Sequence, residues 1–128
     1  MATTQPTSQD ALKAKETYSL IAADKVEGTT VYDAKGEKMG SIHRIMIDKM
    51  SGRVTYAVMS FGGFLGIGDK YHPLPWNMLT YDERLGGYIV NLDRQRLENA
   101  PAYAEDELAW NDPQFGTSVT EYYGPFLH

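Results

Sequence analysis

Four glycines fall within seven residues, from Gly62 to Gly68, and two prolines follow at Pro73 and Pro75. We call residues 62–68 the glycine loop. Glycine permits positive φ, which suits a phosphate-binding loop as well as a hairpin connection. A dinucleotide-binding loop must open a helix, however, and proline breaks helices because it lacks the backbone N–H. The prolines therefore predict an edge strand or a barrel rim, and a β fold.

The region around the glycine loop has the pattern of short strands separated by turns. Residues 53–61 predict the clearest strand, and a central one, because both of its faces are largely apolar. Residues 39–48 predict a second strand in which Ile42 is out of phase with Ile45 and Ile47, so we expect a bulge near His43. The other predicted elements are strands at 29–33 and 70–76, two strands on either side of Gly86 and Gly87, and a short helix over 93–101 capped by Asp93.

Six short strands with few helices predict a mainly β fold, a small antiparallel β-barrel with a short C-terminal helix and arm. The 128 residues suffice for one domain. We predict a flexible N-terminal tail over 1–19, the barrel domain over 20–103 and an acidic, aromatic arm over 104–128. The arm is too apolar to be wholly solvated, so we expect Trp110, Tyr122 and Tyr123 to pack either on the domain or on a neighbouring copy.

Composition excludes several classes of function. The chain has no cysteine, which excludes disulfides, thiolate catalysis and cysteine-ligated zinc. Its net charge of −5 argues against direct nucleic-acid binding, which depends on neutralising phosphates. The N-terminal residues lack the apolar core of a secretory signal, and no stretch is long and apolar enough to span a bilayer. We therefore expect a cytoplasmic protein.

The histidines and carboxylates do not form a recognisable reactive set. His43, His72 and His128 lie too far apart in sequence for a metal-ligand motif, and we expect His43 and His72 on strand surfaces. Asp48 precedes a hairpin turn and is predicted to bind its local backbone. The remaining acidic runs, interpreted as turns and a solvated arm, are Asp82–Glu83, Glu105–Glu107 and Asp112. We expect no catalytic residue, no metal and no cofactor, and so not an enzyme.

Short motifs along residues 20–103 resemble the PRC-barrel family through their order and spacing. They are Gly28, Gly36–Ile42, Asp48, Gly52–Val54, the glycine loop, Pro73–Trp76 and Leu97–Pro101, while Tyr122–Gly124 is similar to the tails of stand-alone members. The resemblance implies a PRC-type barrel that serves as a docking surface rather than as an enzyme. Family members include the cytoplasmic domain of the photosynthetic reaction-centre H subunit and the C-terminal domain of RimM-type ribosome-maturation factors.

The expected function is a non-catalytic protein-interaction module that forms a homodimer, with a protein partner that the sequence does not identify. Phe64, Leu65 and Ile67 of the glycine loop either fold over a barrel end or form an exposed apolar patch. The candidate interaction surface comprises Phe64, Leu65, Ile67, Tyr122, Tyr123 and Phe126. Barrels with open edges tend to pair, which favours self-association.

Two alternatives follow from the family resemblance. The chain could be a ribosome- or RNA-maturation factor that docks on a ribosomal protein, since its acidic charge does not oppose contact with a basic protein. It could instead be a peripheral accessory of a photosynthetic or electron-transfer membrane complex. The sequence holds no Cys-x-x-Cys-His motif, so in that role it would dock without a haem of its own.

Overall fold

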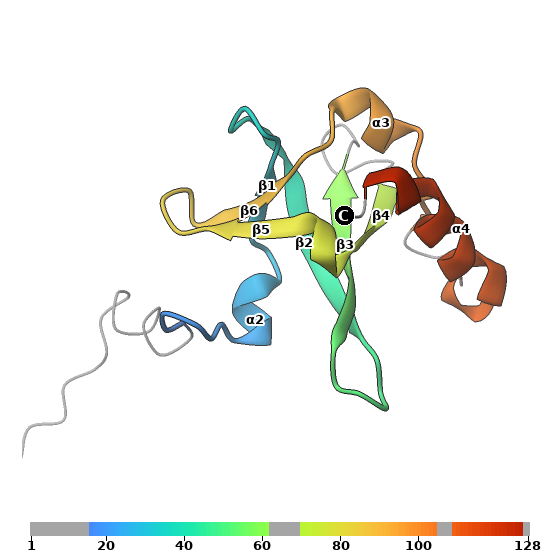
Figure 1. Cartoon of the computed structure of the whole chain (residues 1–128), viewed down its shortest axis with the longest axis horizontal. Coiled ribbons are helices and arrows are strands. Elements are labelled where there is room, and N and C mark those ends of the chain that lie inside the picture. The colour runs from blue at the N-terminus through green and yellow to red at the C-terminus, as the bar shows by residue number, and fades with distance from the viewer. Residues whose placement is uncertain (1–15, 62–69, 105–108, 127–128) are drawn as a thin grey trace, which may run out of the picture.

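The computed structural model describes residues 16–61, 70–104 and 109–126. Within these ranges the chain forms six strands and several short helices (Figure 1). The strands are β1 (Thr30–Tyr32), β2 (Lys38–Ile47), β3 (Val54–Phe61), β4 (Lys70–Pro75), β5 (Leu79–Asp82) and β6 (Gly87–Val90). The α-helices are α2 (Ala23–Val26), α3 (Arg94–Glu98) and α4 (Pro113–Tyr123), with 3₁₀ turns at Trp76–Met78, Ala109–Asn111 and Gly124–Phe126.

The six strands form one curled sheet in the order β4-β3-β2-β1-β6-β5. This confirms the predicted mainly β fold. Four of the five neighbouring pairs are antiparallel, and β1 and β6 run parallel, a pairing that the sequence pattern did not predict. The parallel pair arises because the chain turns through the Trp76–Met78 segment into the β5–β6 hairpin, which returns beside β1.

The strands β2 and β3 extend beyond the rest of the sheet as a two-stranded ribbon (Figure 1). Their pairing continues to Ile47 and Val54, whereas β1 pairs with β2 only as far as Ser41 and β4 pairs with β3 only from Tyr56 onward. The register shifts between Ile42 and Arg44, which confirms the predicted bulge near His43. We call residues 44–53 the ribbon tip.

The edge strand β4 is covered rather than open. Tyr71 and Tyr103 exchange backbone hydrogen bonds of 2.9 and 3.0 Å, so the segment after α3 pairs with part of the outer edge of β4. The prolines of β4 fit an edge strand because their missing N–H groups break no ladder. Among the described residues no helix is long and apolar enough to cross a membrane.

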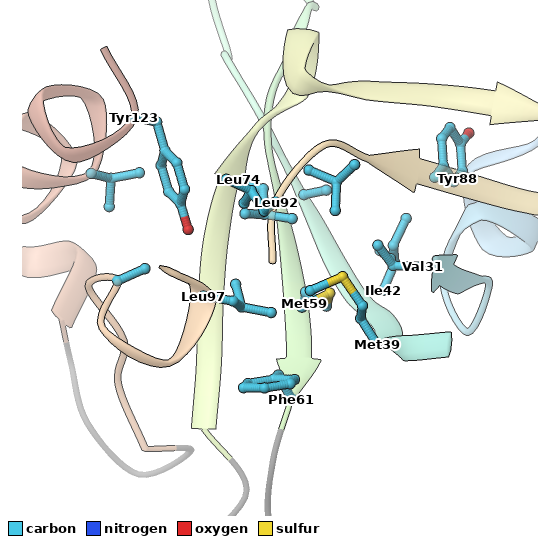
Figure 2. Packing of buried hydrophobic residues seen from close by; sticks show 14 of the residues in the cluster. Val31, Met39, Ile42, Met59, Phe61, Leu74, Tyr88, Leu92, Leu97 and Tyr123 are labelled. Atoms are coloured by element: carbon cyan, nitrogen blue, oxygen red, sulfur yellow. The ribbon is translucent and has the colours of Figure 1, made fainter. Parts of the chain in front are cut away.

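The core joins the sheet to the helices α2, α3 and α4. Figure 2 shows Val31, Ile42, Met59 and Leu74 of the sheet in one buried cluster that extends to Leu97 of α3 and Tyr123 of α4. Two glycines permit close approach of neighbouring strands. A Cβ on Gly40 would lie 2.2 Å from the carbonyl oxygen of Ser60, and one on Gly87 would lie 2.4 Å from that of Thr30. At both positions only glycine fits the backbone spacing.

Candidate functional site

The glycine-loop residues predicted to bind a partner lie outside the described part of the chain. Phe64, Leu65 and Ile67 belong to residues 62–69, so the choice between a barrel-end cover and an exposed patch stays a prediction. The strands that flank the loop, β3 and β4, pair in register up to Phe61 and Lys70. The two strands on either side of the loop are therefore antiparallel neighbours, as the sequence predicts.

The C-terminal arm packs on the domain that precedes it. Tyr123 has no exposed area and lies in the core, whereas Tyr122 is half-buried and its hydroxyl donates to the Arg96 carbonyl at 2.5 Å. Trp110 donates from Nε1 to the Tyr103 hydroxyl at 3.3 Å. These three side chains therefore pack on the domain of their own chain, which was one of the two predicted alternatives; the other was packing on a neighbouring copy. The Tyr123 side chain is thus not part of the surface, and Phe126 ends the last 3₁₀ turn.

The histidines differ from the sequence-based expectation. His72 is 1% exposed, so its predicted position on a strand surface is wrong. The error arises because the face of β4 that carries His72 and Leu74 is covered, and the Phe61 ring packs edge-on against His72 at 5.6 Å. His43 is half-buried beside Tyr71, with 4.4 Å between ring centroids. His128 lies outside the described residues.

Two buried polar atoms, His72 Nδ1 and the Tyr123 hydroxyl, have no hydrogen-bond partner in the described structure. Burial, and to a lesser extent the charge of Lys70, lowers the pKa of His72 from 6.5 to about 4. Burial also raises the pKa of Tyr123 far above its ordinary value. Both side chains are therefore neutral at pH 7, and they act as parts of the core.

Replacing Tyr123 with phenylalanine is expected to raise the free energy of unfolding by about 1 kcal/mol, because it removes a buried hydroxyl that has no partner. Urea denaturation measures this change. Tyr122→Phe is the matched control, and it should lower the free energy of unfolding because the Arg96 carbonyl loses its donor. A loss of stability in Tyr123→Phe would show that the hydroxyl is hydrogen-bonded, for instance to a buried water.

The aspartates of the turns and helix ends are engaged by the backbone. Asp48 accepts from the N–H groups of Met50 and Ser51 at 2.8 and 2.9 Å, as predicted, and these bonds lower its pKa. Asp93 caps α3, which is also confirmed, and Asp112 caps α4, a role that the acidic context of the arm concealed. Each of these carboxylates therefore stabilises a turn or a helix start.

The comparison with protein-family models agrees with this fold. The family model of the PRC-barrel domain matches residues 19–97, which is more than half of the chain. The protein belongs to the PRC-barrel family. A search of curated proteins finds no match. Among solved structures, one named as a 16S ribosomal RNA processing protein, RimM, from Pseudomonas aeruginosa is 21% identical, with a TM-score of 0.40. The match covers 62% of this chain and 48% of that one, so this chain spans about half of its length.

The matched PRC-barrel region ends before the arm, at residue 97. Yet Val119 and Tyr123 of α4 are fully buried in the same core as β3 and β4. Phe115 joins this core to a second aromatic cluster around Tyr71 and Tyr103. Helix α4 of the C-terminal arm is thus an integral layer of this PRC-barrel, and it covers β4.

A recess of about 320 Å³ lies at one end of the PRC-barrel, between the β1–β2 turn and the start of α3. No sequence motif pointed to this recess. The Arg94 guanidinium stands 5.3 Å from the centroid of the Phe61 ring. Asp33 and Asp93, which also line the recess, are engaged by backbone N–H groups. The recess is open and of mixed charge, with Ala34, Met39 and Leu92 as its apolar lining residues.

The exposed large apolar side chains of the PRC-barrel lie on its turns and strand ends. Met50 in the β2–β3 turn is 96% exposed and Ile47 beside it is 51% exposed. Tyr18 and Leu20 are exposed in a turn that Glu16 holds through an ion pair to Lys25 and a hydrogen bond from Tyr81. The protruding parts of the molecule therefore carry its uncovered apolar surface. Sequence reasoning located the β2–β3 turn but did not identify Met50 as its exposed tip.

Proposed function

We propose that this PRC-barrel protein is a non-catalytic docking module that binds a protein partner and associates with a second copy of itself. The observation that carries the proposal is the placement of exposed apolar side chains at protruding positions, above all Met50 and Ile47. Loops and turns held by a rigid scaffold are the common place for binding residues. Large exposed apolar side chains at such places favour contact with another protein.

The non-catalytic part of the proposal is supported by how the polar groups are used. The carboxylates of Asp48, Asp93 and Asp112 accept backbone N–H groups, and His72 is buried in an apolar environment. A general acid or base must reach the substrate, directly or through one water. Groups engaged in turns, caps and the core are poorly placed for that task.

We propose that the protein acts in the cytoplasm and that the glycine loop is a second contact region. This function has two specific forms. The protein could dock on a ribosomal protein, or it could dock on a subunit of a photosynthetic or electron-transfer membrane complex. They differ in the partner, so identifying the partner distinguishes them.

Self-association is tested by light scattering of the purified full-length chain over a range of concentrations. We expect the mass to rise from that of the 14.4 kDa monomer to twice that value as the concentration enters the micromolar range. Such a rise at neutral pH would support the proposed dimer. A constant monomer mass across the whole range would remove self-association from the proposal.

A further inference from the structure

The charge of the chain is divided unevenly between the ribbon tip and the rest of the molecule. The ribbon tip, residues 44–53, holds the three cations Arg44, Lys49 and Arg53 and one acid, Asp48, which gives it a balance of +2. Because the whole chain has a net charge of −5, all other residues together carry −7. We call the remainder of the described molecule the acidic body; it holds eleven acids and seven cations, which gives it a balance of −4.

The cations of the ribbon tip are available to a partner. Arg44, Lys49 and Arg53 are exposed, and no ion pair to them is formed within the described ranges. The one acid of the tip, Asp48, is directed to the N–H groups of its own turn. Met50 and Ile47 add apolar area at the same place. The tip therefore combines positive charge with exposed apolar side chains.

The acidic body presents carboxylates that its own fold does not use. The side-chain carboxylates of five exposed glutamates form no hydrogen bond or ion pair within the described residues, namely Glu27, Glu37, Glu83, Glu98 and Glu121. The aspartates that cap turns and helices are engaged, as described above. The glutamates are thus the side chains of the body that can attract a positively charged ribbon.

We propose that the ribbon tip of one copy docks on the acidic body of a second copy. This inference rests on the proposed self-association and names the surface that produces it. Opposite charges on the two surfaces steer their encounter and fix the orientation, while Met50 and Ile47 lose contact with water in the complex. Two copies related by a two-fold axis would make this contact twice.

A second copy fits the tip better than an anionic membrane or a nucleic acid. Both of those surfaces are negatively charged over a large area. When the tip approaches such a surface, the acidic body is brought near it as well. Repulsion of a body with a charge of −4 opposes the attraction of a tip with a charge of +2. A partner whose acidic charge faces only the tip avoids this repulsion.

Charge reversal at the tip is the direct test. The double variant Lys49→Glu and Arg53→Glu is compared with wild type by sedimentation at low salt. We expect the dimer dissociation constant to rise tenfold or more, because like charges then face each other. For wild type, raising the salt to about 0.5 M should weaken the dimer, since exposed charges are screened.

The matched control reverses two exposed cations elsewhere. Lys35→Glu and Arg84→Glu change the net charge by the same amount, but they lie on the β1–β2 and β5–β6 turns. This control is expected to keep the dimer. A mixture of wild type with the tip variant should also form mixed dimers by native mass spectrometry, because the acidic body of the variant still accepts a wild-type ribbon tip.

Three results would overturn the inference. A tip variant that dimerises like wild type would place the contact elsewhere, for instance at the edge strand β5, and would leave the proposed self-association intact. Wild type that stays monomeric would contradict both proposals. A third result would assign the tip to membranes instead. In that case wild type stays monomeric and sediments with vesicles of anionic phosphatidylglycerol, whereas the tip variant does not sediment with them.

Discussion

Replacing Gly40 with alanine is expected to lower the free energy of unfolding by about 3 kcal/mol. A Cβ at this position would lie 2.2 Å from the carbonyl oxygen of Ser60, which is a backbone atom that cannot rotate away. Ser60 pairs with Ser41, the residue after Gly40, so relief of the clash requires β2 and β3 to separate. These two strands join the β4–β3 part of the sheet to the β1–β6–β5 part, and the damage is therefore expected to be global.

The same substitution at Gly116 serves as the control. A Cβ there would approach only the Tyr56 hydroxyl, at 3.4 Å, and Gly116 lies within α4. Alanine is favoured over glycine inside a helix by about 1 kcal/mol, so Gly116→Ala should be neutral or stabilising. Urea denaturation of both variants measures the contrast. If Gly40→Ala stays within about 1 kcal/mol of wild type, the close approach of β2 to β3 is incorrect.

The second large effect is a loss of stability between pH 6.5 and 4 that depends on His72. The folded pKa of His72 is about 4, and its ordinary value is 6.5. Above pH 6.5 the imidazole is neutral in both states, so it adds no pH dependence. Below pH 6.5 the unfolded chain binds a proton that the folded chain rejects. Each unit of difference corresponds to about 1.4 kcal/mol, so the loss approaches about 3 kcal/mol near pH 4.

The variant His72→Leu removes the titrating group and keeps an apolar side chain in the core. Its free energy of unfolding should be flatter than that of wild type as the pH falls from 6.5 to 5. Glu16, whose pKa is lowered chiefly by its hydrogen bond from Lys25, loses its own contribution only at more acidic pH. Chemical denaturation at several pH values separates the contribution of His72 to stability from that of Glu16. Equal slopes in wild type and variant would contradict the burial of a neutral His72.

The fold was largely predictable because its signals are local. Glycines and prolines mark the turns and the edge strand, and the phase change at Ile42 located the bulge at His43. Asp93 was recognised as a helix cap from the residues beside it. Each of these features depends on neighbours within a few positions, which a single sequence displays.

The candidate site was less predictable because it depends on contacts between distant segments. His72 is buried where the Phe61 ring at the end of β3 packs against it, on the face of β4 whose Leu74 lies in the core with residues of α3 and α4. The parallel pairing of β1 with β6 arises from the path of the chain after Trp76–Met78. Met50 is exposed because β2 and β3 extend beyond the neighbouring strands β1 and β4. A pattern of neighbouring residues does not reveal such contacts between segments that lie far apart in the sequence.

The central claim, that this PRC-barrel docks on a protein, is tested most directly by capture in the native host. Tagged chain expressed at its native level is lightly crosslinked, purified and analysed by mass spectrometry, in parallel with the variant Met50→Asp. We predict that wild type captures its own copies together with one dominant protein in fixed proportion, and that the variant loses at least one of these contacts. Recovery of neither a second copy nor a reproducible protein partner would contradict the account.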